Sequence, residues 1–145
     1  MAILKAARSA QYLMESEFTF TIGDTMTNTA GAADAFATVA AHVFDVINMP
    51  PGAVVMSGEV VTDTAFTGST AYNVKVGDSV SDTRYLGTTD KTTAGRTALV
   101  PTGYLGLGEN IRLTVTPTVA TATAGKITLR VVYAQTGRGN ESVPA

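Results

Sequence analysis

The feature that most constrains the fold is an alternation of apolar and polar residues that recurs along the chain. It is strict in residues 17–22, and it returns in residues 71–76, 111–116 and 126–134. Successive side chains of a β-strand point to opposite faces of a sheet, so a period of two is typical of half-buried strands. Threonine, a β-branched residue that favours strands, accounts for 24 of the 145 residues. The pattern therefore predicts an all-β protein.

Three further segments complete the expected set of strands. Residues 39–47 carry apolar groups on both faces, and residues 97–101 form a short strand. Residues 53–66 are the longest β segment, in which Gly58 is expected to mark a bulge where the strand bends.

The segments between these strands are expected to be loops. Residues 23–37 and 79–86 each have room for one helical turn, and residues 103–108 are expected to form a tight hairpin loop between the strands on either side. About eight strands without a long helix leave two solutions, a two-sheet antiparallel sandwich or a closed barrel. We expect a sandwich of the jelly-roll type, because the number of strands matches that architecture.

The chain divides into one domain and two ends. A length of 145 residues is enough for one domain with its own core. Residues 17–135 are expected to form the β-sandwich domain, and residues 136–145 a C-terminal tail. Residues 1–16 are alanine-rich and lack the alternation, so we expect either an N-terminal arm that reaches a neighbouring subunit or a first element of the domain. No apolar run reaches the length of a signal-peptide core or a membrane span, and we expect a cytoplasmic product.

Composition argues against several classes of site. The sequence has no cysteine and one histidine, which leaves no disulfide, thiol enzyme, Cys-ligated metal or His-pair metal motif. A net charge of −2, with 15% charged residues, argues against nucleic-acid binding. We therefore expect no cofactor, no metal site and no direct contact with nucleic acid.

Nucleophilic catalysis has weak support. Ser79 follows Gly77 as in a nucleophile elbow, but Ser81 stands where the second glycine is required. His42, the one possible base, lies on an apolar segment, where a hydrogen-bonded core or interface histidine is expected. The glycines of residues 103–108 do not follow a phosphate-binding order. No catalytic residue is therefore assigned.

The acidic loop that starts at Asp78 resembles a calcium loop only in part, because Val80 stands where the cation would need an oxygen ligand. We expect a structural turn instead, in which Asp82 caps the backbone and Arg84 pairs with a carboxylate.

Carbohydrate chemistry is the remaining candidate. Glu59 and Asp63 share one face of a strand about 13 Å apart, which is too wide for a glycosidase pair. Four tyrosines are candidates for a sugar-binding platform, although tryptophan is absent: Tyr72, Tyr85, Tyr104 and Tyr133. The more ordinary expectation is solvent-facing charges and tyrosines buried at the sheet edges.

Four stretches of the sequence resemble small virion proteins of tailed bacteriophages. They read FDVINMPPGAVVMSGEVVTDTAF, YNVKVGDSVSDTRYL, TALVPTGYL and AGKITLRVVYAQTGR, and they lie within residues 44–138. The family is that of the capsid decoration, or cement, proteins, and the resemblance is strongest to its jelly-roll type, as found in a Bordetella phage.

The resemblance implies a structural protein without enzymatic activity. Such proteins bind the outside of an assembled head and bridge adjacent capsomers, so the implied partner is the major capsid protein. The implied location is the capsid exterior of a virion assembled in the bacterial host cytoplasm. The implied oligomer is a homodimer, with a homotrimer as the alternative, and neither nucleic acid nor membrane is contacted.

We expect the interface with the capsid or with other subunits to lie on the arm, the tail and exposed apolar loop tips. The candidate residues are Ile3, Leu4, Lys5, Arg8, Tyr12, Leu13, Leu105, Leu107 and Arg138. Two other classes of function stay open, a carbohydrate- or receptor-binding module displayed on the virion and a small hydrolase on a β scaffold.

Overall fold

The computed structural model describes residues 12–136, and within this range it contains ten strands and no helix. The strands are β1 (Met14–Thr21), β2 (Thr25–Thr27), β3 (Ala33–Ala35), β4 (His42–Ile47), β5 (Ala53–Thr67), β6 (Ala71–Gly77), β7 (Leu86–Asp90), β8 (Gly95–Ala98), β9 (Ile111–Thr118) and β10 (Ala124–Gln135). The all-β class expected from the alternation is confirmed.

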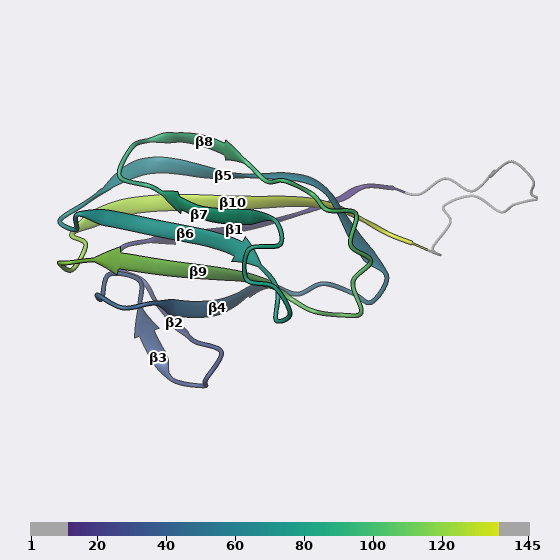
Figure 1. Ribbon diagram of the computed structural model, residues 1–145, viewed down its shortest axis with the longest axis horizontal. Coiled ribbons are helices and arrows are strands. Elements are labelled where there is room, and N and C mark those ends of the chain that lie inside the picture. The colour runs from purple at the N-terminus through teal and green to yellow at the C-terminus, as the bar shows by residue number, and fades with distance from the viewer. Residues whose placement is uncertain (1–11, 137–145) are drawn as a thin grey trace, which may run out of the picture.

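Eight of the strands form two four-stranded antiparallel sheets that lie face to face (Figure 1). Sheet I has the order β1-β10-β5-β8, and sheet II has the order β4-β9-β6-β7. The pairing is nested, because β1 pairs with β10, β4 with β9, β5 with β8 and β6 with β7. A long hairpin wrapped in this way into two sheets is a jelly roll, as expected from the strand count.

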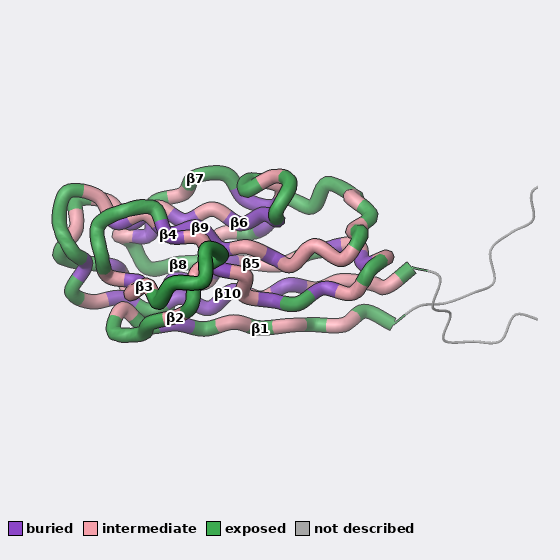
Figure 2. Tube along the Cα trace, turned by 90° about the horizontal axis from the view of Figure 1, so that it is seen from below, coloured by how far each residue is buried: buried purple, intermediate pink, exposed green. Residues whose placement is uncertain are grey.

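The core lies between the two sheets. Along β10, buried positions alternate in part with more exposed ones, as an inner and an outer face require (Figure 2). Stacked aromatic rings fill one region of the core, with ring centroids 4.0 Å apart for Phe20 and Phe36 and 3.8 Å apart for Phe66 and Tyr72. The buried Tyr72 hydroxyl donates a hydrogen bond of 2.9 Å to the Phe36 carbonyl oxygen. This polar group therefore has a partner inside the core.

Sheet I contains bulges, but none is at Gly58. Gly58 stays in the ladder opposite Val131, whereas the register shifts leave Met56 and Asp63 of β5 without a partner on β10. Gly58 serves another purpose, because a Cβ there would lie 2.5 Å from the Arg130 carbonyl oxygen and 2.6 Å from the Leu99 side chain. The expected bulge position was therefore wrong, and the glycine accommodates a close contact with its neighbours.

Four short strands differ from the sequence expectation. Residues 23–37 form the β2–β3 hairpin with no helical turn, and β7 lies at the end of a segment expected to be a loop. The strand expected at 97–101 is shifted, since β8 covers Gly95–Ala98. These short strands carry few apolar residues, so periodicity gives them almost no signal.

Candidate interaction surface

The outer face of sheet I carries a row of alternating charges that crosses all four strands. Phe18 and Phe20 of β1 point inward, so Glu17, one residue before Phe18, points outward. Glu17 pairs in register with Arg130 of β10, and Arg130 with Glu59 of β5. Glu59 pairs in turn with Ala98 of β8. Arg96, two residues before Ala98, donates a hydrogen bond to the Glu59 carboxylate. We call Glu17, Arg130, Glu59 and Arg96 the charge row.

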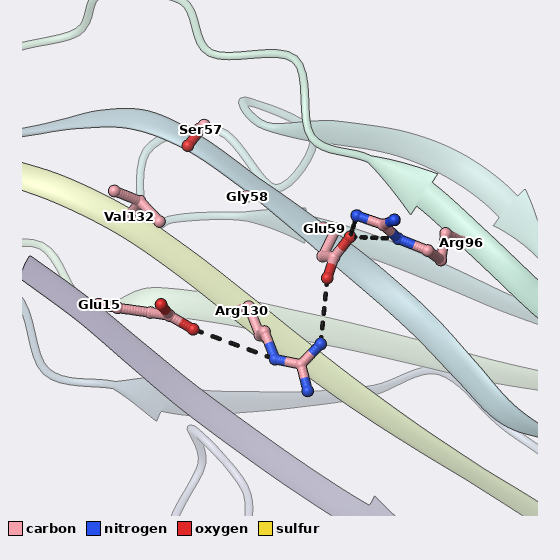
Figure 3. Close-up of a pocket in the computed structure, with 7 residues that line it drawn as sticks. All are labelled: Glu15, Ser57, Gly58, Glu59, Arg96, Arg130 and Val132. Carbon is pink, nitrogen blue, oxygen red and sulfur yellow. Dashed lines mark hydrogen bonds and ion pairs between the residues drawn. The ribbon is translucent and has the colours of Figure 1, made fainter.

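Hydrogen bonds link neighbouring members of the charge row. Arg130 Nε donates to Glu17 Oε2 at 2.8 Å. Arg130 Nη1 donates to Glu59 Oε1 at 3.0 Å, a contact drawn in Figure 3. Arg96 Nε donates to the other oxygen, Glu59 Oε2, at 2.6 Å. Glu15 adds a longer ion pair of 4.0 Å to Arg130. Each arginine keeps exposed surface, because the side chains of Arg130 and Arg96 are 40% and 76% exposed.

Electrostatics within the row favour the charged forms. The hydrogen bond from Arg96 lowers the pKa of Glu59. Partial burial alone would raise this pKa, but the hydrogen bond from Arg130 lowers it further, and the two bonds together outweigh burial. The hydrogen bonds to Glu17 and Glu59 raise the pKa of Arg130. Glu59 and Arg130, at the centre of the row, are therefore held in their charged forms.

Beside the charge row, one end of the same face is apolar. Leu13 has the outward parity of Glu15 and Glu17, and it is 61% exposed. The other members are Val132 of β10, Val54 and Met56 of β5, and Leu105, which forms an isolated bridge with Val54. Met56 and Leu105 are 52% and 50% exposed. We call Leu13, Val54, Met56, Leu105 and Val132 the apolar end.

The structure brings together four of the nine interface residues that the sequence suggested. Tyr12 and Leu13 precede β1, and Leu105 and Leu107 lie beside the start of β5 at the same end of the sandwich. All four are at least half exposed. The other five lie outside the described residues: Ile3, Leu4, Lys5, Arg8 and Arg138.

The loop that carries Leu105 and Leu107 is not the hairpin loop that was expected. Its flanking strands β8 and β9 belong to different sheets, so residues 99–110 cross from one layer to the other. Hydrogen bonds from Gly106 N to the Ala53 carbonyl and from Gly52 N to the Gly106 carbonyl hold the loop against β5. Glu109 also accepts a hydrogen bond of 2.7 Å from Leu107 N. The two leucines are therefore presented on an anchored loop.

The turn after β6 is structural, but the capping residue is Asp78 and not Asp82. Asp78 Oδ1 accepts hydrogen bonds from the backbone amides of Val80 and Ser81 at 2.9 and 2.8 Å, and Arg84 forms an ion pair with the same carboxylate. Burial alone would raise the pKa of Asp78, yet the bonds from Arg84 and the two amides outweigh it and lower the pKa. Asp82 instead pairs with Lys75 at 3.0 Å.

His42 is a buried structural histidine. Its Nδ1 lies 3.0 Å from an Asp34 carboxylate oxygen, and its Nε2 lies 3.0 Å from the Thr38 carbonyl oxygen. These contacts tie β4 to the β2–β3 hairpin. Both ring nitrogens of His42 thus have other partners than Ser79, which lies on the turn after β6.

The structure engages the four tyrosines in other roles, and Tyr133 is partly buried against the core. Tyr72 is fully buried and Tyr85 is 6% exposed, so neither presents a ring face to a ligand. Tyr104 is occupied by Arg84, whose guanidinium carbon lies 3.6 Å from the ring centroid. The two carboxylates also have separate structural roles, since Glu59 belongs to the charge row and Asp63 accepts a hydrogen bond of 2.8 Å from Thr128.

Two general features complete the description of residues 12–136. Within this range no group of three or more His, Cys, Asp or Glu side chains is placed to hold a metal ion. The same part of the chain has no helix that is long and apolar enough to cross a membrane.

The charge row was missed in the sequence. Its members are up to 113 residues apart, as for Glu17 and Arg130, and each reads as an ordinary surface charge. The one available signal was parity, because each strand places its charged residue opposite to the buried apolar positions. Only the strand order shows that the signs alternate.

Comparison with known proteins gives matches among solved structures alone, since neither known protein families nor curated proteins match the sequence. A chain in the cyanophage Pam1 capsid asymmetric unit is 22% identical with a TM-score of 0.63, covering 92% of this chain and 93% of that one. A chain in the acid-stable capsid of Helicobacter pylori bacteriophage KHP30 is 18% identical with a TM-score of 0.56, covering 88% and 90%. A chain in the capsid of Ralstonia phage GP4 is 14% identical with a TM-score of 0.55, covering 93% and 92%. Over nearly its whole length, this chain shares its fold with chains of three phage capsids.

Proposed function

We propose that this chain is a structural, non-enzymatic virion protein that binds the outer surface of a phage head and cements adjacent capsomers of the major capsid protein. The observation that carries the proposal is the fold, which is shared along about nine-tenths of the chain with proteins of three phage capsids. The sequence resemblance to capsid decoration proteins supports the exterior location and the cementing role.

The surface described above suits this work. An exposed apolar end rimmed by charges is the composition of a protein-binding surface. Weak contacts suffice on a capsid, because a protein that bridges two capsomers gains effective concentration from its first contact. The candidate contacts with the capsid or with other subunits are Tyr12, Leu13, Leu105 and Leu107 on the described residues, with Ile3, Leu4, Lys5, Arg8 and Arg138 on the two ends of the chain. Self-association as a homodimer, or alternatively as a homotrimer, belongs to the same proposal.

A binding assay with expanded heads tests the proposal. Purified protein is mixed with heads assembled without it, and bound protein is counted after sedimentation of the heads. We expect saturable binding at a fixed number of copies per major capsid protein, and we expect heads without it to lose DNA at lower temperature or on EDTA treatment. Absence of binding, together with unchanged resistance of the heads, contradicts the proposal.

A further inference from the structure

We propose that the outer face of sheet I packs against the same face of a second copy of this chain, across a two-fold axis that runs parallel to the strands. This inference rests on the self-association in the proposed function and specifies the surface and its geometry. The sheet II face, which the loop after β6 borders, takes no part in it.

The order of charges makes the face complementary to itself. Across sheet I, the charge row reads negative at Glu17, positive at Arg130, negative at Glu59 and positive at Arg96. An axis between β10 and β5, parallel to the strands, places β1 against the partner's β8 and β10 against the partner's β5. Glu17 then faces the partner's Arg96, and Arg130 faces the partner's Glu59. Every member of the row meets a charge of opposite sign.

The alternative two-fold arrangement is excluded by the same order. An axis in the plane of the interface but perpendicular to the strands places each strand against its own copy. Arg130 would then face the partner's Arg130, and Glu59 the partner's Glu59. Like charges held opposite each other cost several kcal/mol in an interface. The row therefore selects the axis parallel to the strands.

The same axis also matches the apolar groups. It leaves each position along the strands unchanged, so the apolar end of one copy meets the apolar end of the other. Leu13, at the β1 edge, comes to lie opposite the partner's Leu105, and Val132 of β10 lies opposite the partner's Ser57, beside the bulged Met56. Charge and apolar surface thus agree on one arrangement.

The face has the size and shape that a dimer contact needs. Four strands spaced about 4.8 Å apart make it roughly 19 Å wide. The 12 residues of β10 make it roughly 40 Å long. Such a strip is comparable with the roughly 800 Å² that each partner buries in a standard interface. A shallow depression of about 310 Å³ lies beside the apolar end, lined by Ser57, Gly58 and Val132 together with Glu59, Arg96 and Arg130 of the charge row (Figure 3). The neighbouring Met56 is the flexible side chain that the axis brings toward the partner's depression.

Two charge-reversal variants test the inference. Each should weaken its own homodimer, and a mixture of the two should restore dimerisation. Arg96→Glu places negative charges opposite Glu17, and Glu17→Arg places positive charges opposite Arg96. Each variant alone should show a dimer dissociation constant at least tenfold higher than the natural sequence. A 1:1 mixture should form a heterodimer of near-normal affinity, since both contacts then join opposite charges.

The measurement is sedimentation velocity of the full chain at about 1 to 100 µM, a range that brackets the dissociation constant of an interface of moderate affinity. Lys75→Glu is the control, because it reverses an exposed charge on sheet II and should leave the dimer unchanged. Circular dichroism melting of every variant establishes that each is folded. A natural protein that stays monomeric or forms trimers, single variants that dimerise normally, or a mixture that does not recover would each overturn the inference.

The head-binding assay separates this inference from the proposed function. Protein that dimerises as described but does not bind heads sustains the inference and removes the function. Monomeric protein that binds heads sustains the proposed head binding and removes the inferred dimer.

Discussion

At the scale of single residues, Gly58 shows how tightly sheet I is packed. Any side chain at this position meets the Arg130 carbonyl oxygen and Leu99, at 2.5 and 2.6 Å from a Cβ. We expect Gly58→Ala to lower the free energy of unfolding by about 1–3 kcal/mol, the usual cost of overpacking. Chemical denaturation measures the change.

Gly87→Ala is the matched control for this substitution. Gly87 also lies in a strand, but a Cβ there has open space and no positive φ. Its replacement should change stability by less than about 0.5 kcal/mol. Equal losses at the two positions would show that strand propensity, and not the close contact, decides the effect.

The Asp78 carboxylate should make the fold sensitive to acid. Its pKa lies below that of the unfolded chain, because the bonds from Arg84 and two backbone amides outweigh burial. The carboxylate therefore stabilises the fold above the unfolded pKa of about 3.9, and this contribution is lost as pH falls through the folded pKa. Melting temperatures measured between pH 7 and pH 3 should fall more steeply for the natural protein than for Asp78→Asn. Parallel curves would contradict the role given to this carboxylate.

At the scale of elements, the start of β1 sets how much of the N-terminal segment can be removed. The segment expected to be an arm covers residues 1–16, but Met14, Glu15 and Ser16 pair with β10. Deletion of residues 1–11 spares this pairing, so we expect an unchanged melting temperature and weaker binding to heads. Deletion of residues 1–16 should lower the melting temperature as well. A normal head affinity after the shorter deletion would remove the arm from the proposed contact.

Strands were predicted well where apolar alternation is long and badly where it is short. β6, β9 and β10 follow their periodicity closely, because one face of each is buried in the core. β7, with the sequence LGTTD, offers a single large apolar residue, and it exists because β6 supplies hydrogen-bonding partners. Tertiary pairing of this kind leaves no trace in the local sequence.

At the scale of the whole molecule, the jelly-roll architecture was predictable and the candidate surface only partly so. Strand number and alternation limited the fold to a sandwich or a barrel. The exposed leucines of the loop at 103–108 were identified, yet their position beside Leu13 depends on strand order in sheet I. The charge row depends entirely on that order, because only the order of the strands decides which charges lie next to each other.

The exposed loop leucines allow head binding to be separated from dimerisation. Leu107 is 79% exposed and is not a member of the apolar end. We expect Leu107→Asp to weaken head binding at least tenfold while the dimer persists, because a charge would be buried against the capsid without a partner. Val80→Asp, at a side chain that is 70% exposed, should have no effect on either measurement. Equal effects of the two changes would point to general charge repulsion.

The nested pairing also fixes when this protein can fold. Of the strands in residues 12–136, β1 is synthesised first, but its partner in sheet I is β10, the last of them to leave the ribosome. The β6–β7 hairpin can close early, whereas the pair β1–β10 must bring together segments more than a hundred residues apart. Until translation passes Gln135, β1 lacks its hydrogen-bonding partner in sheet I. A nascent chain of this topology therefore depends on rapid completion after release, and its folding rate sets how soon a new copy is available for assembly.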